Sequence, residues 1–389
     1  MIYLDNNATT RPSPAVVRAA TAALEDAWHN PSSVHRPGQA ARATVELARA
    51  ETARLINAKP REIIFTSGGT EALDLAVRGS LEARTPAGGK GVLVTSAVEH
   101  AALRDLGEDL GRSRVQVRLA PLSPGGVVDV GALPPLLAGA TTAAFAWANN
   151  ETGAIQPVEQ IGRACREAGV TFVVDGTQWV GKMPADTSSL PADFMAFSPH
   201  KFHGPKGVGV LWARAGARLR PRLLGAQELG RRGGTENVPG IAGAGAACAE
   251  AAAWLADDAR RARLAGDRDE FERLVLAGSP GAVVNGVTAP GARLWNTTNI
   301  AFPRLEAEAI LMLLSEAGVC ASAGAACSSG SLEPSPVLLA MGIDPAVAHG
   351  AVRFSLGRDT TPDEVRDAAA IVVRCVARLR GSTGSALGQ

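Results

Sequence analysis

One short stretch of this sequence carries most of the side chains that could do chemistry. Residues 194–207 begin as an apolar strand and end in a polar turn that contains Ser198, His200 and Lys201. A lysine directly after a strand end suits a Schiff base, provided that its amine is desolvated enough to be nucleophilic. Ser198 and His200 would then supply hydrogen-bond donors to an anionic cofactor group. The alternative is a surface loop that follows a strand.

Other reactive side chains also follow short apolar runs. Asp175 ends the run 172–175, where a carboxylate is costly unless a positive group such as a protonated pyridine nitrogen lies beside it. A helix N-cap is the alternative for Asp175. His100 and Asn150 follow two further runs, where a structural histidine and an ordinary Asn/Gly turn are the alternatives. Ser67 to Glu71 form a small-residue turn that opens a helix, which suits a phosphate or a plain N-cap.

The C-terminal part adds a thiol and a guanidinium. Cys327 lies in a segment of almost only small residues, 321–331, which we expect to be exposed and mobile. Because cysteine is usually buried, this placement indicates a reactive thiol. Arg353 alternates with apolar neighbours on an expected strand, and a buried arginine needs a carboxylate, which a substrate could provide.

Strands and helices must position these groups. Short β-branched or apolar runs alternate with helix-length segments, at 63–66, 92–96, 115–119, 143–148, 172–175, 194–197 and 208–212. This alternation predicts an α/β fold with a mostly parallel seven-stranded sheet, whose ligands gather at the carboxyl ends of the strands. We expect a large domain over 13–257 and a smaller α+β domain from 1–12 and 258–389, with a disordered tail from residue 381.

The bulk composition excludes several function classes. The 389 residues are 46% hydrophobic and 20% charged, as in an ordinary globular protein. Because 39 basic and 38 acidic residues leave a net charge of +1, nothing indicates a nucleic-acid or acidic-membrane partner. The five cysteines form no Cys-x-x-Cys pair, which argues against disulfides and a metal site and fits the cytoplasm. We expect no signal peptide and no run near the about 18 apolar residues of a membrane span.

Six motifs together resemble one family. The sequence is similar to the cysteine desulfurases of the NifS/IscS-like group, which are fold-type I pyridoxal 5'-phosphate enzymes in the class V aminotransferase superfamily. The resemblance runs from Tyr3 to about Thr361. The motifs lie at 4–10, 65–71, 149–153, 198–201, 232–237 and from Cys327 to Ser335.

The resemblance implies a role for each matching residue. Lys201 would bind the cofactor covalently and move the substrate Cα proton, Asp175 would pair with the pyridinium nitrogen, and His100 would stack on the ring. Gly69, Thr70, Ser198 and His200 resemble the phosphate site, whereas Gln178 and Asn150 match groups near the phenolic oxygen and the substrate carboxylate. Arg353 matches the carboxylate clamp, and Cys327 the nucleophile. Thr235 would reach the phosphate of a neighbouring subunit, which implies a homodimer.

The implied reaction converts L-cysteine into L-alanine and a persulfide on Cys327, for iron–sulfur cluster assembly or other sulfur transfer. The spacing from Cys327 to Pro334 resembles the longer-loop type, which implies direct delivery to an assembly scaffold. A selenocysteine lyase, a class V aminotransferase and a non-catalytic assembly scaffold are the alternatives. The chain departs from the family pattern at Ala325, Ala226 and Leu229, where Ser, Gly and more often Arg are expected.

Overall fold

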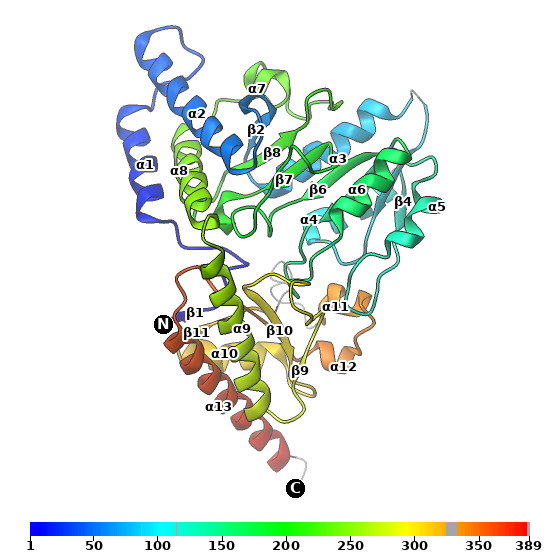
Figure 1. Ribbon diagram of the computed structural model, residues 1–389, viewed down its shortest axis with the longest axis vertical. Helices are drawn as coiled ribbons and strands as arrows, with labels where there is room; N and C mark the ends of the chain where they lie inside the picture. The colour runs from blue at the N-terminus through cyan, green and yellow to red at the C-terminus, as the bar shows by residue number, and fades with distance from the viewer. Residues whose placement is uncertain (87, 114, 324–332, 387–389) are drawn as a thin grey trace.

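A seven-stranded sheet forms the centre of the larger lobe of the computed structural model, which describes residues 1–86, 88–113, 115–323 and 333–386, with side chains as far as residue 381 (Figure 1). The strand order is β2-β8-β7-β6-β5-β3-β4. Within this sheet β8 is antiparallel to β2 and β7, and the other neighbouring strands are parallel. The strands are β2 (Ile63–Thr66), β3 (Gly91–Thr95), β4 (Val115–Leu119), β5 (Thr142–Ala146), β6 (Thr171–Asp175), β7 (Phe194–Phe197) and β8 (Gly209–Ala213). The predicted mostly parallel seven-stranded sheet is confirmed.

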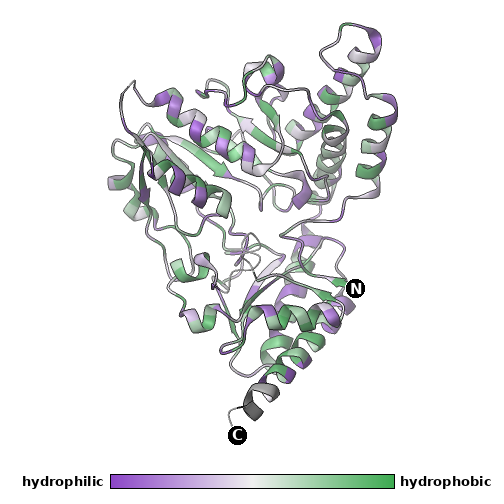
Figure 2. Cartoon of the chain, turned by 180° about the vertical axis from the view of Figure 1, so that it is seen from behind, coloured by the Kyte–Doolittle hydropathy of each residue, from purple (hydrophilic) through white to green (hydrophobic). Residues whose placement is uncertain are grey.

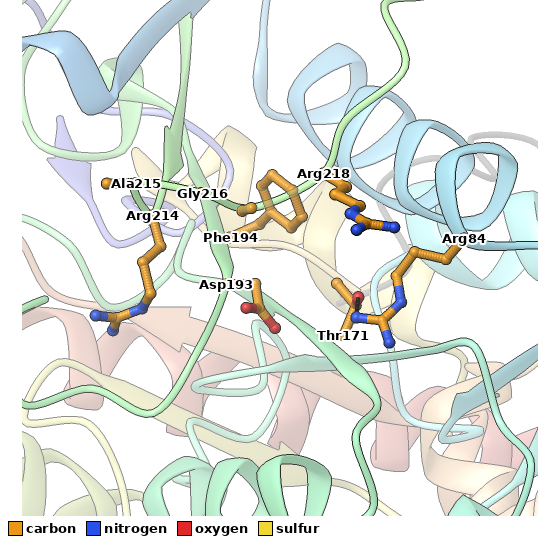
Figure 3. A pocket seen from close by; sticks show the side chains of 9 residues that line it. Arg84, Thr171, Asp193, Phe194, Arg214, Ala215, Gly216 and Arg218 are labelled. Atoms are coloured by element: carbon orange, nitrogen blue, oxygen red, sulfur yellow. Dashed lines mark hydrogen bonds between the residues drawn. The ribbon is translucent and has the colours of Figure 1, made fainter.

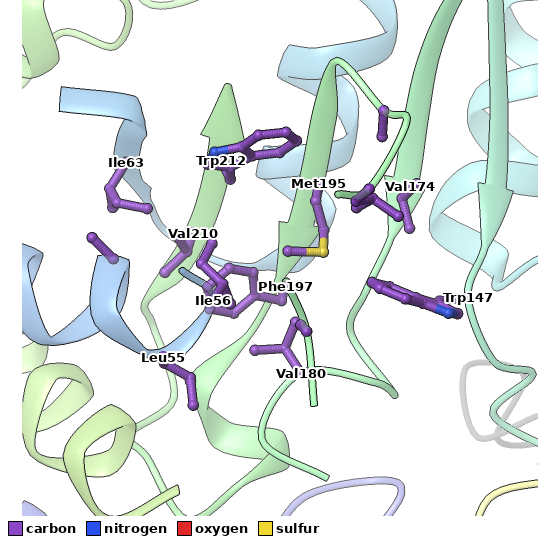
Figure 4. Close-up of a cluster of buried hydrophobic side chains, with 14 of the residues drawn as sticks. Leu55, Ile56, Ile63, Trp147, Val174, Val180, Met195, Phe197, Val210 and Trp212 are labelled. Atoms are coloured by element: carbon purple, nitrogen blue, oxygen red, sulfur yellow. The ribbon is translucent and has the colours of Figure 1, made fainter. Parts of the chain in front are cut away.

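Helices cover both faces of this sheet, which is why its strands read as continuous apolar runs. Val173 packs on one face with α3 (Gly69–Arg84) and α4 (Ala101–Gly111). Its neighbour Val174 packs on the other face, in the cluster drawn in Figure 4. The helices on that second face are α1 (Pro14–Asp26), α2 (Arg36–Leu55), α5 (Leu133–Leu137), α6 (Val158–Glu167) and α8 (Val238–Leu255). In Figure 2 the sheet strands are coloured mainly hydrophobic, whereas the covering helices are mixed.

The second lobe is built on a three-stranded antiparallel sheet of order β12-β10-β9. Its own hydrophobic cluster includes Phe271, Ile300 and Phe354. The strands are β9 (Val283–Val284), β10 (Thr297–Ala301) and β12 (Ala351–Ser355). The helices are α9 (Asp258–Gly278), α10 (Ala307–Glu316), α11 (Pro336–Ala340), α12 (Pro345–Ala348) and α13 (Pro362–Ala386). Since Trp254 also packs into this cluster, the boundary at residue 257 stays a prediction.

The start of the chain lies between the two lobes. β1 (Ile2–Tyr3) pairs in parallel with β11 (Val319–Cys320), and Asp5 then forms a β-bridge with Ser355 of β12. Residues 7–10 continue towards the carboxyl end of β7, where the backbone N–H of Thr10 donates to the carbonyl of His200. We call residues 5–10 the N-terminal arm. It brings polar side chains to the edge of the large sheet where ligands are expected.

Two expectations about helices were wrong. The segment from residue 381 was expected to be disordered, but α13 continues as far as Ala386. We also expected no run with the length and apolarity of a membrane span, but α8 has both over 18 residues. Half of that window is buried, and α8 packs against α1 and α2, because its many alanines and glycines allow close approach of neighbouring helices.

Candidate functional site

The carboxyl edge of the large sheet gathers most of the predicted site residues. Asp175 is the last residue of β6, and Ser198 directly follows β7. α3 begins at Gly69, just after β2, and Asn150 lies in the turn after β5. Because these four strands are parallel, their ends lie at one edge, so side chains more than 100 residues apart become neighbours.

Lys201 ends the short helix η3 (Pro199–Lys201) and points at the N-terminal arm. Its Nζ donates to the backbone carbonyls of Asn7 and Ala8, both at 2.8 Å. His200 Nδ1 lies 3.1 Å from Thr9 Oγ1. Burial, followed by the charge of Lys201, lowers the pKa of His200 to about 4, so this imidazole is neutral at neutral pH.

Asp175 is a buried carboxylate that has no basic partner in an ion pair among the residues that the structure describes. Its Oδ1 accepts a hydrogen bond from the backbone N–H of Thr177 at 2.9 Å. A protonated ring nitrogen would satisfy this carboxylate, because a buried charge needs an opposite one. The predicted pairing of Asp175 with such a nitrogen therefore fits the environment.

His100 is the N-cap of α4, and its Nε2 is the ring nitrogen that can donate a hydrogen bond. Its Nδ1 accepts from the backbone N–H of Ala102 at 3.1 Å, so the neutral ring carries its proton on Nε2. Burial lowers the pKa of His100, while the negative charge of Asp175 acts in the opposite direction. A neutral imidazole with an Nε2–H donor is the form that suits a ring-stacking and proton-transfer role.

The amino end of α3 forms a small cradle with Ser198. The N-cap of this helix is Gly68, and no side chain of the described residues caps it, so its first backbone N–H groups can bind an anion. A Cβ added at Gly69 would lie 3.2 Å from Thr177 Oγ1 and 3.6 Å from Ser198 Cβ. Two hydroxyl side chains and a positive helix end therefore meet here, as a phosphate requires. Thr70, in the first turn, is exposed.

Arg353 joins the second lobe to this edge. Its Nη2 forms an ion pair with Asp5 Oδ1 at 2.8 Å, and its Nη1 donates to the backbone carbonyl of Asn150 at 3.2 Å. The Nε–H of Arg353 is buried and has no hydrogen-bond partner among the residues that the structure describes. An unsatisfied buried donor on a nearly inaccessible guanidinium fits the predicted contact with a substrate carboxylate.

Three predicted site residues do not belong to the groups described above. Gln178 donates from Nε2 to the Asn7 carbonyl at 3.1 Å. Thr235 is exposed and makes no hydrogen bond to Lys201 in the described part of the chain. Its loop is held to α3 by an ion pair, in which Arg232 Nε lies 2.8 Å from Glu71 Oε1. Cys327 lies outside the described residues.

The sequence analysis gave no role to several residues that the structure places at this site. Asp5 and Asn7 belong to the family motif at residues 4–10. That motif could have indicated that they lie at the site, although no role was predicted for either residue. Lys182 and Glu99 gave no signal by residue type or spacing. Glu99 is fully buried beside Asp175: it accepts from Ser96 Oγ at 2.5 Å and from the Ala146 backbone N–H at 2.8 Å, and burial raises its pKa to about 8.

A separate cavity of about 530 Å³ lies at the opposite edge of the sheet (Figure 3). It is lined at the amino ends of β6 and β7 by Thr171 and Phe194, with Arg84 and Arg214 at its walls. None of the predicted site residues lines it. Within the described ranges, no cluster of three or more His, Cys, Asp or Glu residues could hold a metal ion.

Comparisons with known proteins agree with this geometry. Residues 2–367 match the family model described as aminotransferase class-V. A cysteine desulfurase of Trichormus variabilis is 43% identical over 382 residues, which is 98% of this chain and 94% of the relative. A solved structure described as a NifS-like protein has a TM-score of 0.88 and 32% identity, covering 97% of this chain and 99% of that chain. A solved structure of SspA in complex with cysteine has a TM-score of 0.79 and 29% identity, covering 93% of this chain and all of that chain. The chain therefore belongs to the class-V aminotransferase family and, within it, to the cysteine desulfurases.

Proposed function

We propose that this chain removes the sulfur of L-cysteine, producing L-alanine and a persulfide on Cys327. The observation that carries the proposal is one cluster at the carboxyl edge of the large sheet. It combines the amine of Lys201, the buried carboxylate of Asp175 and the uncapped amino end of α3. These groups match the aldehyde, the ring nitrogen and the phosphate of pyridoxal 5'-phosphate, on which the family depends.

The residues of the chain that would hold the cofactor are assigned as follows. Lys201 bonds to it covalently, and Asp175 keeps its ring nitrogen protonated. Gly69, Thr70, Ser198 and His200 bind its phosphate, and Gln178, Asn150 and His100 contact its ring and ring substituents. When bound, pyridoxal 5'-phosphate supplies an electron sink that makes the substrate Cα–H acidic and the substrate sulfur transferable.

Lys201 and Arg353 act on the substrate itself. Arg353 binds the α-carboxylate of L-cysteine, using the Nε–H that lacks a partner within the described part of the chain. Lys201 would move the proton at Cα, because a free lysine amine can act as a base. His100, neutral and with its proton on Nε2, can pass a proton to or from the substrate.

Cys327 completes the reaction as the nucleophile. A cysteine suits this step because its thiolate is strongly nucleophilic near neutral pH. The Cys327 thiolate would form an S–S bond to the substrate sulfur as the substrate Cβ–S bond breaks. The electron pair of that bond would pass to Cβ, which takes up a proton and becomes the methyl group of alanine. The persulfide is then delivered to an acceptor protein, and we infer an iron–sulfur scaffold as that acceptor.

We also infer that the enzyme works as a homodimer, in which Thr235 reaches the phosphate in the other subunit. Exposed apolar side chains near the Thr235 loop support a protein interface on this face. Leu224 is 84% exposed and Leu229 71%. A cavity of about 470 Å³ lies between α2 and the segment 226–231 and would offer a recess to the second copy. Analytical ultracentrifugation of the wild type and of Leu224→Asp measures this directly.

We assign the reaction to the cytoplasm. The described cysteines Cys165, Cys248, Cys320 and Cys375 are all free thiols, which is in keeping with a reducing compartment. The division into a large domain, 13–257, and a smaller one, 1–12 with 258–389, is part of the same proposal.

Peptide mass spectrometry after incubation with L-cysteine tests the activity. The Cys327 peptide should gain the mass of one sulfur atom, and alanine should form in the same sample. Turnover of L-cysteine, selenocysteine and a keto acid should be compared in parallel. Preferred turnover of selenocysteine would identify a lyase, keto-acid turnover an aminotransferase, and a colourless protein without cofactor a scaffold.

A further inference from the structure

Lys182 is a buried lysine without an acidic partner. It lies in the turn after β6, its side chain is almost inaccessible, and no carboxylate within the described ranges is close enough for an ion pair. Burial, and then the positive charges of Lys201 and Arg353, hold its pKa well below the usual value. A buried amine is costly, so its hydrogen-bond partners must account for its presence.

Those partners are two side-chain amide oxygens. Lys182 Nζ donates to Gln178 Oε1 at 2.6 Å and to Asn7 Oδ1 at 2.7 Å. Both hydrogen bonds that Lys182 Nζ makes among the described residues therefore go to amide oxygens rather than to a carboxylate. Because each amide oxygen is directed at Lys182, the nitrogen of each amide must face the other way.

The orientation of these two amides has a consequence at Lys201. Gln178 Nε2 faces the site and donates to the backbone carbonyl of Asn7 at 3.1 Å, the same carbonyl that accepts from Lys201 Nζ at 2.8 Å. Asn7 is fixed from the second lobe as well: Asn296 donates to its Oδ1 at 3.0 Å, and its own Nδ2 donates to Thr297 at 2.9 Å. A chain of three hydrogen bonds therefore connects Lys182 to the amine of Lys201.

A small cavity lies beside the same pair of lysines. It has a volume of about 20 Å³, and both Lys182 and Lys201 line it. A space of this size holds about one water molecule. The positive charge of Lys201 also helps to lower the pKa of Lys182, so a change at one amine affects the other.

We propose that Lys182 is a positioning residue for the reaction. It holds the amide of Gln178 with its nitrogen towards the cofactor site, and through Asn7 it holds the carbonyl that orients the amine of Lys201. Lys182 contacts neither substrate nor cofactor. The inference rests on the proposed function in one respect: the group that Gln178 Nε2 faces is taken to be the bound cofactor. A purely structural Lys182, which only links the arm to the large lobe, would affect stability and leave the chemistry of the bound cofactor unchanged.

The pH titration of the visible absorption band of the bound cofactor separates these two roles. Lys182→Met keeps the length of the side chain and removes both N–H donors. With the Gln178 amide free to turn, a donor to the phenolic oxygen is lost, so the band should titrate about one pH unit higher. We expect kcat for L-cysteine to fall about tenfold with little change in KM. Lys90→Met, which removes an exposed lysine before β3, is the control and should match the wild type.

A double variant shows whether Lys182 acts through Gln178. Gln178→Ala should shift the titration in the same direction, and Lys182→Met added to it should change the titration little further, because coupled residues are not additive. Additive shifts, or an unchanged titration in Lys182→Met, would overturn the proposal. Lys182→Gln covers the case in which Lys182→Met does not fold. Its amide is one atom shorter and reaches at most one acceptor, so an intermediate shift supports the role and no shift overturns it.

Failure of the proposed function has a different signature. A wild-type protein in which borohydride reduction attaches no cofactor to Lys201 would reject the function itself. A wild-type protein with cofactor on Lys201 and normal turnover, but with a titration that Lys182→Met leaves unchanged, would reject only the role of Lys182.

Discussion

Arg353 of the second lobe and Asp5 of the N-terminal arm form a buried ion pair, with Nη2 and Oδ1 2.8 Å apart. The guanidinium is 2% exposed, and its Nη1 is held by the Asn150 carbonyl of the large lobe. Asp5 therefore fixes the plane of the guanidinium, and Nε has no hydrogen-bond partner in the described ranges. The N-terminal arm, the edge of the large sheet and the second lobe together determine the orientation of the Arg353 side chain.

Arg353→Lys should weaken substrate binding more than it slows turnover. Lysine keeps the positive charge but lacks the planar fork, so it cannot hold Asp5 and a substrate carboxylate together. We expect kcat/KM for L-cysteine to fall about a hundredfold, mainly through KM, since about 2.7 kcal/mol of binding is lost. Arg366→Lys, an exposed change on α13, should leave both constants unchanged. An unchanged KM in Arg353→Lys would remove the arginine from carboxylate binding.

Cys327→Ala should separate cofactor binding from sulfur transfer. The variant should retain the yellow cofactor on Lys201 and bind L-cysteine with a spectral change, because none of the cofactor-binding residues is altered. It should release no sulfide, which a methylene-blue assay measures. The buried Cys248→Ala is a matched control and should keep sulfide release at the wild-type rate. Sulfide release at that rate from Cys327→Ala would assign the nucleophile elsewhere.

Glu99 should make the folded protein less stable as the pH rises. Burial raises its pKa from 4.5 to about 8, so the folded state keeps a proton that the unfolded state has lost between these values. The unfolded state then binds fewer protons, and the free energy of unfolding falls with pH in this window. The slope from this one group is at most about 1.4 kcal/mol per pH unit. Below pH 4.5 its contribution is fully present, and it is lost as the pH passes 8.

Glu99→Gln should flatten this dependence. The amide can accept from the Ala146 N–H and donate to Ser96, so the hydrogen bonds are kept while the titration is removed. Thermal melting between pH 5 and 8.5 measures the change, with the exposed Glu167→Gln as the control. Equal slopes in Glu99→Gln and the wild type would show that Glu99 is charged at neutral pH.

The Arg49–Glu228 pair should be important for stability. The guanidinium of Arg49 makes two hydrogen bonds to Glu228, at 2.7 and 2.9 Å, and the same carboxylate accepts from the Phe65 N–H at 2.9 Å. Glu228→Gln leaves the buried Arg49 with only the exposed carboxylate of Glu46, 3.2 Å from its Nε, as a counter-charge, and should cost about 3–5 kcal/mol in the free energy of unfolding.

Urea denaturation with a matched control checks this value. Glu159→Gln breaks an exposed pair with Arg163 and should cost less than about 1 kcal/mol. A loss in Glu228→Gln as small as that of the control would contradict the assignment. Because Glu228 and Leu229 both have positive φ, at 50° and 57°, Leu229→Gly should also relieve strain and raise stability slightly.

The sequence by itself determined the sheet and most of the site edge. Strands in a sheet covered by helices on both faces tend to be apolar runs, so β2, β4 and β7 lie at the expected residues and the other strands within one or two residues of them. Since parallel strands end at one edge, Asp175, Ser198 and Asn150 could be predicted to lie together from their places in the chain. These are local patterns combined with one rule of topology.

Only the tertiary structure decided how the lysines and amides are paired. Lys182 meets Asn7 across 175 positions of sequence, and Arg353 meets Asp5 across 348. No periodicity encodes such contacts, because they depend on how the arm and the second lobe are placed against the sheet. The same holds for Glu99, whose raised pKa comes from burial that a sequence does not display. Side-chain chemistry can be read from the chain, whereas the environment that tunes it exists only after folding.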